Sequence, residues 1–286
     1  MADHGEIGPL KRTTEKTVRS SGPYAYPFHR LDAGVARREK VQRMNILLTN
    51  DDGYEAPGLI AAFEAVRGLG AVLVVAPSSE RSACSHAITI GRPISVQEVT
   101  HPTLGLVYAV DGTPADCVRL AVTELSDGPI DLVVSGINRG ANAGVDMFYS
   151  GTVAGAREAA ILDLPAIAVS QSVRTEVETD WNAASEIAAK LIRGLYAEPL
   201  PAPGFWNINL PMPIPPDAEK HVHRVPAAVH PMPMIFNRAE KRDGRREYAY
   251  GASYWLRDVS GPSDYSVIRD GGIAVTAVPL FGTFPA

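Results

Sequence analysis

Residues 45–58 read NILLTNDDGYEAPG, and this stretch joins a buried strand to a charged turn. Its apolar run has the composition of a strand that is covered on both faces. Asp51 and Asp52 follow at once, although neighbouring side chains cannot both enter a core and two like charges repel at this distance. Pro57 suits the first turn of a helix. The stretch therefore predicts a strand, a charged turn and a helix.

Strands and helices are predicted to alternate after this point. The sequence LIAAFEAVRGLG places four apolar residues on one helical face, and AVLVVAP then forms a second short strand. The later predicted strands are LVYAVDG, DLVVSG, PAIAVS and FWNINLP, and the later helices are TPADCVRLAVTEL, GTVAGAREAAIL and WNAASEIAAKLIRGLY. This alternation is typical of an α/β fold, a mostly parallel sheet with helices on both faces.

The alternation breaks after Pro211. The segments PMPIPP, NRAEKRDGRREY and YAYGASYWL contain prolines, a basic run and short aromatic pieces, and a last strand, GIAVTAVPL, follows them. We interpret residues 44–286 as one domain with an appended hairpin arm at about residues 212–268. The basic run from Arg238 to Arg246 is expected to be a solvated hairpin, although it could help to hold an anionic substrate.

The composition excludes several classes of protein. The chain has 286 residues, 45% of them hydrophobic, and a net charge of −5, with 27 lysines and arginines against 32 aspartates and glutamates. Polymeric nucleic acid is therefore a disfavoured partner. No run approaches the about 18 apolar residues that a membrane span needs. Two cysteines, Cys84 and Cys117, build no disulfide framework, which fits a cytoplasmic protein.

The first 43 residues are polar, mixed in charge and without an apolar segment. They resemble neither a signal peptide nor a membrane anchor. Because Met44 stands directly before the first predicted strand, we interpret residues 1–43 as an appended tail without a fixed structure, and Met44 as a candidate for the original start.

Polar residues gather where the predicted strands end. In open α/β sheets, ligands bind outside the carboxyl ends of the strands. Asp51 and Asp52 follow the first strand, Ser82 the second and Asn138 the strand DLVVSG. These side chains offer only oxygen, which Mg²⁺ and Mn²⁺ prefer, and a cation would turn the repulsion between the carboxylates into attraction. The competing interpretation is a polar turn before the helix at Pro57.

A second polar group opens the helix in YSGTVAGAREAAIL. Ser150, Gly151 and Thr152 stand at its start, where unpaired N–H groups and the positive end of the helix dipole favour an anion. We predict a phosphate here, while the alternative is an ordinary serine N-cap on an alanine-rich helix. In VDGTPADCVRLA, by contrast, Thr113, Pro114 and Asp116 form a capping box, so Asp116 is expected to be structural.

Five blocks of the sequence resemble the signature blocks of the SurE family of stationary-phase survival proteins. They are MNILLTNDDG, APSSERSACSHAIT, VDGTPADCVRLA, DLVVSGINRGANAG and YSGTVAGAREAA, in this order. The similarity is close from Met44 to Ser170 and looser in WNINLP, YWL and VTAVPL. The first 43 residues have no counterpart in the usual pattern, and the basic hairpin region matches it poorly.

The resemblance implies a Rossmann-like, three-layer α/β core with a protruding C-terminal β-hairpin arm, exchanged between the subunits of homodimers or homotetramers. It implies that Asp51, Asp52, Ser82 and Asn138 hold one divalent metal ion per subunit, Mn²⁺ or Mg²⁺, and that Asp51 and Asp52 are catalytic. Asn138, Ser150, Gly151 and Thr152 would bind the phosphate. The implied activity is hydrolysis of nucleoside 5′- and 3′-monophosphates, with short polyphosphate as a further substrate.

Other classes fit the residues less well. A response-regulator receiver, which would be a phosphate-binding signalling module without turnover, also has paired acids after its first strand. It needs a phosphoacceptor aspartate after the third, and Asp111 leads straight into a capping loop. Haloacid-dehalogenase phosphatases require DxDx[TV], and dinucleotide-binding oxidoreductases require GxGxxG, which NDDGYEAPG does not supply.

Overall fold

Nine strands of the described residues form one sheet. In a computed structural model of the chain, the described residues are 44–174, 177–198, 200, 203–231, 233–242, 245–251, 257 and 261–281. The predicted tail, residues 1–43, lies outside them. The order of the strands is β3 (Val96–His101), β4 (Gly105–Val110), β2 (Gly70–Pro77), β1 (Met44–Thr49), β5 (Leu132–Arg139), β6 (Ala166–Gln171), β7 (Gly204–Leu210), β11 (Ile273–Pro279) and β8 (Val222–Arg224).

The six strands from β4 to β7 in this order are parallel, as the alternating sequence predicts. The edges differ, because β3 pairs antiparallel with β4, and β11 pairs antiparallel with β7. Strands β3 and β8 were not predicted. Both are largely exposed, and β8 has only 3 residues, so they lack the continuous apolar run that marks the inner strands.

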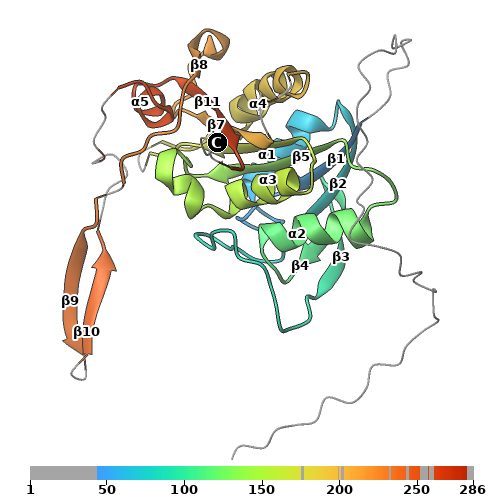
Figure 1. Ribbon diagram of the computed structural model, residues 1–286, viewed down its shortest axis with the longest axis horizontal. Helices are drawn as coiled ribbons and strands as arrows, with labels where there is room; N and C mark the ends of the chain where they lie inside the picture. Colours follow the sequence, from blue (N-terminus) through green and yellow to red (C-terminus); the bar gives the residue numbers. More distant parts are fainter. Residues whose placement is uncertain are drawn as a thin grey trace, which may run out of the picture. The chain divides into compact units, whose positions relative to one another are not determined.

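Helices cover both faces of this sheet, which makes three layers (Figure 1). Helices α1 (Pro57–Val66) and α4 (Trp181–Tyr196) pack on one face. Helix α2 (Pro114–Leu120), a π-helical turn (Ala121–Leu125) and α3 (Gly151–Ile161) pack on the other, and α5 (Asp264–Arg269) packs against β11. No described helix is long and apolar enough to cross a membrane.

Strand β1 shows why the inner strands read as continuous apolar runs. Leu47 belongs to the core beneath α2 and α3, whereas its neighbours Ile46 and Leu48 belong to the core beneath α1 and α4. Successive side chains of a strand point to opposite faces, so a sheet covered on both faces needs apolar residues at every position. The first polar residues after β1 consequently mark the open edge of the sheet.

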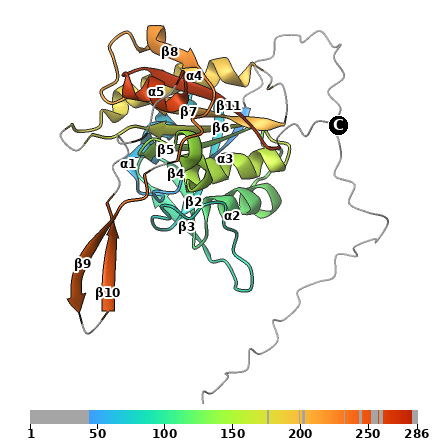
Figure 2. The ribbon, with the colours of Figure 1, turned by 60° about the vertical axis from the view of Figure 1, so that its left-hand side comes forward.

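The predicted hairpin is present. Strands β9 (Phe236–Arg242) and β10 (Arg245–Tyr250) pair only with each other among the described strands, and Figure 2 shows them outside the nine-stranded sheet. The range 212–268 also contains β8 and most of α5, which belong with the sheet. The predicted strand-like piece at residues 252–256 lies outside the described residues.

Strand β5 is longer than predicted, and this matters for the site. After a shift in register between Ser135 and Asn138, β5 resumes its pairing with β6, with Asn138 opposite Ser170. Asn138 therefore lies at the end of the strand and not in the loop after it. The start of α1 lies against this strand, because a Cβ on Gly58 would fall 1.9 Å from the carbonyl oxygen of Ile137.

We predict that Gly58→Ala destabilises the protein. The added methyl group would overlap a main-chain oxygen, so α1 would have to move away from β5, at a cost of about 1–3 kcal/mol or more. Gly68→Ala is the matched control, because a Cβ there meets nothing within 4 Å. Chemical denaturation of both variants tests this expectation, and equal stability of the two would contradict it.

Candidate functional site

Asp51 is buried between the end of β1 and the start of α3. Its side chain accepts hydrogen bonds from the hydroxyl group of Thr152, at 2.5 Å, and from the Thr152 amide. Its carbonyl oxygen accepts a hydrogen bond from the amide of Arg81, at 2.7 Å, in the loop after β2. One loop and one helix thus hold this residue, and its carboxylate lies at the positive end of α3.

Asp52 is held by a different element. Its Oδ2 atom accepts a hydrogen bond from the amide of Arg139, at 3.0 Å, at the end of β5. The two adjacent acids are therefore fixed by different partners, Asp51 by α3 and Asp52 by β5. This separation answers the steric question that the sequence raises, because the side chains need not enter the same part of the core.

The charges remain unfavourable in spite of these hydrogen bonds. Burial raises the pKa of Asp51 to about 6, the Thr152 hydrogen bonds oppose this rise, and the neighbouring charge of Asp52 adds to it. Burial also raises the pKa of Asp52, with a further contribution from Glu80. A cation bound beside these carboxylates would stabilise their ionised forms, so the arrangement favours binding of positive charge.

Asn138 lies at the same edge of the sheet as these two acids. Its Nδ2 atom donates a hydrogen bond to the carbonyl oxygen of Gly140, at 2.7 Å, so its Oδ1 oxygen is the atom that could meet a cation. Gly140 adopts φ of 133°, and the amide of Arg139 is already engaged with Asp52. Asn138 and Asp52 are thus positioned by one short segment at the end of β5.

Ser82 is close to this group in the chain but differently oriented. Arg81, its neighbour, binds the main chain of Asp51, whereas the hydroxyl group of Ser82 donates to Glu80, at 2.6 Å. Ser82 is exposed. The structure therefore places the loop of Ser82 at the site but directs its oxygen to another carboxylate, and a side-chain rotation would be needed to bring it to a cation.

The three residues that were predicted to bind phosphate, Ser150, Gly151 and Thr152, make different contacts in the structure. Ser150 is the N-cap of α3, and its Oγ atom accepts a hydrogen bond from the amide of Val153, at 3.0 Å. Thr152 is fully buried and bound to Asp51. A Cβ on Gly151 would fall 2.8 Å from both the Cβ of Asp51 and the Sγ of Cys84, so only glycine fits there. Gly151 brings the helix start against Asp51.

Sequence reasoning missed a buried carboxylate that connects this region to its surroundings. Glu158 of α3 binds His86 at 2.7 Å and Arg119 at 2.6 Å, so it ties the Ser82 loop and α2 to α3. Burial alone would raise the pKa of Glu158, but the two hydrogen bonds outweigh it and lower the pKa. A lone acid in the alanine-rich helix of residues 151–161 was the available clue.

A second missed cluster consists of asparagines behind the edge of the sheet. The amide of Asn142 donates to Asn209 at 2.7 Å, its side chain donates to Ser170 at 2.8 Å, and its carbonyl oxygen accepts from Asn207 at 2.8 Å. Asn207 and Asn209 stand two positions apart in β7, so both point to one face. They fix the loop that follows β5.

The capping box was predicted correctly. Thr113 caps α2 by accepting a hydrogen bond from the amide of Asp116, whose own carboxylate binds the amide of Thr113 and both the amide and hydroxyl of Thr89. All the hydrogen bonds of Asp116 thus serve the structure of α2 and the adjoining loop. It is not part of the candidate site.

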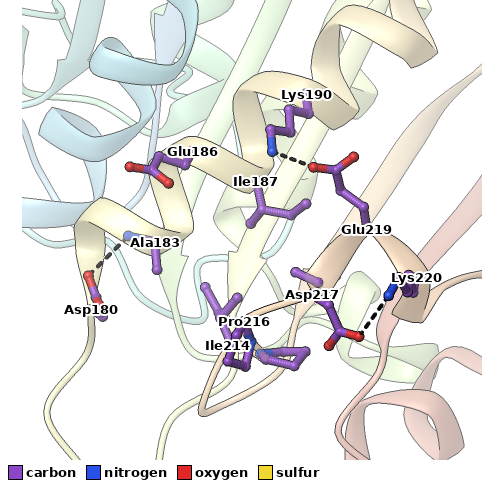
Figure 3. A pocket seen from close by; sticks show the side chains of 12 residues that line it. Asp180, Ala183, Glu186, Ile187, Lys190, Ile214, Pro216, Asp217, Glu219 and Lys220 are labelled. Atoms are coloured by element: carbon purple, nitrogen blue, oxygen red, sulfur yellow. Dashed lines mark hydrogen bonds and ion pairs between the residues drawn. The ribbon is translucent and has the colours of Figure 1, made fainter.

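A hollow of about 620 Å³ lies elsewhere in the described part of the chain, between α4 and residues 214–220 (Figure 3). Its charged lining residues are Asp180, Glu186, Asp217 and Glu219 against Lys190 and Lys220. Both lysines point to an acid, Lys190 to Glu219 and Lys220 to Asp217. This surplus of negative charge repels a phosphate ester, so volume alone does not identify the site.

Side chains with oxygen donors thus lie at one edge of the sheet. Within the described ranges, no three His, Cys, Asp or Glu side chains gather to form a metal site. The candidate instead combines two carboxylates with the amide oxygen of Asn138, a donor set that suits a hard cation such as Mg²⁺ or Mn²⁺. The observation that fits a cation best is the unfavourable burial of Asp51 beside Asp52.

Comparisons with known proteins show which family this chain is similar to. The sequence pattern of the family described as Survival protein SurE matches residues 46–230, a range that includes every predicted site residue. The chain belongs to the SurE family. The crystal structure of the SurE protein from Aquifex aeolicus superposes with a TM-score of 0.72, at 32% identity, over 84% of this chain and 94% of that chain.

Relatives of this SurE chain carry names that state an activity. A protein of Geobacter sulfurreducens named 5′-nucleotidase SurE is 41% identical over 83% of this chain and 88% of its own length. A protein of Myxococcus xanthus with the same name is 42% identical over 81% and 86%, respectively. A putative 5′-nucleotidase of Nostoc is 37% identical over 82% of this chain and 98% of its own length.

We predict a pH-dependent stability of the metal-free SurE chain. Because the folded-state pKa of Asp51, about 6, lies above its ordinary value of 3.8, the protonated carboxyl favours folding. This contribution is complete below the ordinary pKa and is lost as the pH rises through about 6, with a total of about 3 kcal/mol. Denaturation in EDTA from about pH 3.5 to about pH 7.5 should show the loss. Asp51→Asn should make the loss smaller without removing it, because the pKa of Asp52 is raised as well.

The Ser82 loop provides another prediction. Ala83 adopts φ of 55°, a left-handed conformation that costs an alanine about 1–2 kcal/mol, whereas glycine adopts it freely. After the larger chain entropy of glycine in the unfolded state is subtracted, Ala83→Gly should stabilise the protein by about 0.5–1 kcal/mol. Ala87→Gly in the same loop is the control and should not stabilise the protein. Thermal denaturation of both variants in the presence of EDTA measures the difference, and equal melting temperatures would contradict the prediction.

Proposed function

We propose that this chain is a metal-dependent phosphatase that hydrolyses nucleoside 5′- and 3′-monophosphates to nucleoside and phosphate, with short polyphosphate as a further substrate. The observation that carries this proposal is the buried carboxylate of Asp51 next to the half-buried carboxylate of Asp52, both held at the carboxyl edge of the sheet. The names of the relatives, 5′-nucleotidase SurE, support the substrate class.

Asp51, Asp52, Ser82 and Asn138 would hold one divalent metal ion per subunit, Mn²⁺ or Mg²⁺. The donors are all oxygen atoms. Burial raises the pKa of Asp51, and a bound cation would lower it again by stabilising the ionised carboxylate. A bound ion would neutralise the phosphoryl group and lower the pKa of a nearby water molecule. Ser82 has to leave Glu80 to join the other three ligands.

The residues of the chain would share the remaining work of phosphoryl transfer, which is chiefly positioning and charge stabilisation. Thr152 and the amide of Arg139 keep the two carboxylates in fixed orientations. Either Asp51 or Asp52 takes the proton of the attacking water. The Gly151 amide and the dipole of α3 favour the phosphoryl oxygens, while Ser150 keeps the helix start in place as its cap.

The alternative of a receiver-like module that binds phosphate without turnover is not favoured. Asp111, the candidate phosphoacceptor, directly follows β4, which lies between β3 and β2 at one end of the parallel strands. Its carboxylate is bound by Arg81 at 2.6 Å and by Arg92 at 3.0 Å. A carboxylate fixed by two guanidinium groups is a weak nucleophile, so Asp111 is better explained as an anchor for the Ser82 loop.

We further propose that the enzyme is a cytoplasmic homodimer or homotetramer that exchanges its C-terminal arm, about residues 212–268. In support, Phe236, Tyr248 and Tyr250 of the hairpin are more than half exposed, and a group of exposed large side chains of this kind is typical of a protein–protein interface. Cys84 and Cys117, both among the described residues, are free thiols, as a reducing compartment would keep them.

We predict that Asp51→Asn lowers the turnover of AMP in Mn²⁺ by more than about 100-fold, because the amide removes the negative charge that holds a cation. The variant keeps the Oδ1 acceptor for Thr152, so its melting temperature in EDTA should be equal or higher. Release of phosphate with and without EDTA measures the effect.

Asp127→Asn, on an exposed loop, is the matched control and should retain full turnover. Absence of turnover by the unaltered protein in both Mn²⁺ and Mg²⁺ would refute the proposed function. Loss of folding in Asp51→Asn would instead return this residue to a structural role.

A further inference from the structure

Two large aromatic side chains are exposed directly beside the candidate site. Phe148 is 66% exposed and Tyr149 is 62% exposed, and both immediately precede Ser150, the cap of α3. An exposed aromatic ring lacks the favourable free energy that its burial would provide. Adjacent exposed aromatic side chains therefore often mark a surface that binds a ligand or another protein. The metal and phosphate chemistry described above uses neither of them.

The main chain that carries these rings is firmly held. Ser85 donates two hydrogen bonds to it, from its amide to the carbonyl oxygen of Tyr149 at 2.9 Å and from its hydroxyl group to that of Phe148 at 2.6 Å. The amide of Tyr149 binds the carbonyl oxygen of Asp146 at 2.9 Å. The rings are therefore presented from a fixed backbone, so a ligand that contacts them would order only side chains.

Arg157 supports Phe148 from the protein side. Its guanidinium carbon lies 6.0 Å from the centroid of the Phe148 ring and 5.9 Å from that of Phe205, and its Nη2 atom donates to the carbonyl oxygen of Met147 at 2.9 Å. A cation on one face of an aromatic ring orients that ring. With 66% of its surface exposed, Phe148 still has most of its area available to a ligand.

The position of the pair along the chain matches the size of a nucleotide. Consecutive Cα atoms are about 3.8 Å apart, so the Cα of Tyr149 lies within about 8 Å of that of Gly151. Gly151 is in contact with Asp51, at the proposed position of the phosphate. A ribose bridges a gap of this order between a phosphate group and a base.

We infer that Phe148 and Tyr149 form the surface on which the base of the nucleoside monophosphate stacks, and that this contact selects nucleotides over other phosphate monoesters. The inference rests on the proposed function, because it assumes that the phosphate lies at Asp51 and Gly151. Stacking on an aromatic ring tolerates any base, since every base has a π face. Purine and pyrimidine monophosphates would both be accepted.

A pair of matched substrates isolates the contribution of the base. AMP and ribose 5-phosphate carry the same ester, but only AMP has a base. The quantity to measure is the ratio of their kcat/KM values in Mn²⁺, for the unaltered protein, Phe148→Ala, Tyr149→Ala and the double variant. We expect the unaltered ratio to exceed about 10 and the ratio of the double variant to fall to near 1, with the change mainly in KM.

Three controls make the result specific. Tyr149→Phe keeps the ring and should keep the ratio. Tyr196→Ala removes a partly exposed aromatic side chain at the end of α4 and should leave the ratio unchanged. Light scattering should find the double variant in the same oligomeric state as the unaltered protein. A changed state would mean that Phe148 and Tyr149 belong to a subunit interface, and this would overturn the inference.

The remaining outcomes are also decisive. Equal losses for AMP and ribose 5-phosphate would show that the pair only supports α3, and an unchanged ratio would show that the base lies elsewhere; either result overturns the inference. If the unaltered protein hydrolyses neither substrate, the proposed function fails instead. The stacking surface is then still tested by isothermal titration calorimetry with adenosine. The inference requires that the double variant binds adenosine at least about fivefold more weakly than the unaltered protein.

Discussion

The structure of the site depends on one electrostatic constraint, the burial of the Asp51 carboxylate at the start of α3 next to a second acid. The hydroxyl and amide of Thr152 compensate part of the cost, and the helix dipole adds to this compensation. The compensation is incomplete, because burial still raises the pKa of Asp51 to about 6. Positive charge is what the arrangement lacks, and that need connects the fold to metal-dependent chemistry.

Tight packing of main chain keeps the constraint in place. Gly151 has no room for a side chain between Asp51 and Cys84, and Gly58 has none against the carbonyl oxygen of Ile137. These two glycines bring α3 and α1 close to the ends of β1 and β5, where the acids and Asn138 lie. The buried Glu158 then binds the Ser82 loop through His86, so the loop, the helices and the strand ends form a connected unit.

The charges and rings at the edge of the sheet divide the recognition of a nucleotide into two parts. The oxygen donors and the start of α3 suit a cation and a phosphate, whereas Phe148 and Tyr149 suit a flat, uncharged base. The hollow beside α4 suits neither, because four acids against two lysines give it a negative potential. Placement and chemistry, more than volume, distinguish a nucleotide site here.

The sequence alone determined which segments alternate as inner strands and helices along the chain, the cap at Thr113, and the edge of the sheet at which Asp51, Asp52 and Asn138 lie. These features follow from local periodicity and from the rule that parallel strands end on one side. Only the tertiary structure decided that Thr152 binds Asp51, that Ser82 turns to Glu80, and that the exposed strands β3 and β8 complete the sheet. The physical reason is that a side-chain oxygen binds whichever donor or acceptor the fold brings within about 3 Å, and residue spacing along the chain does not encode that partner.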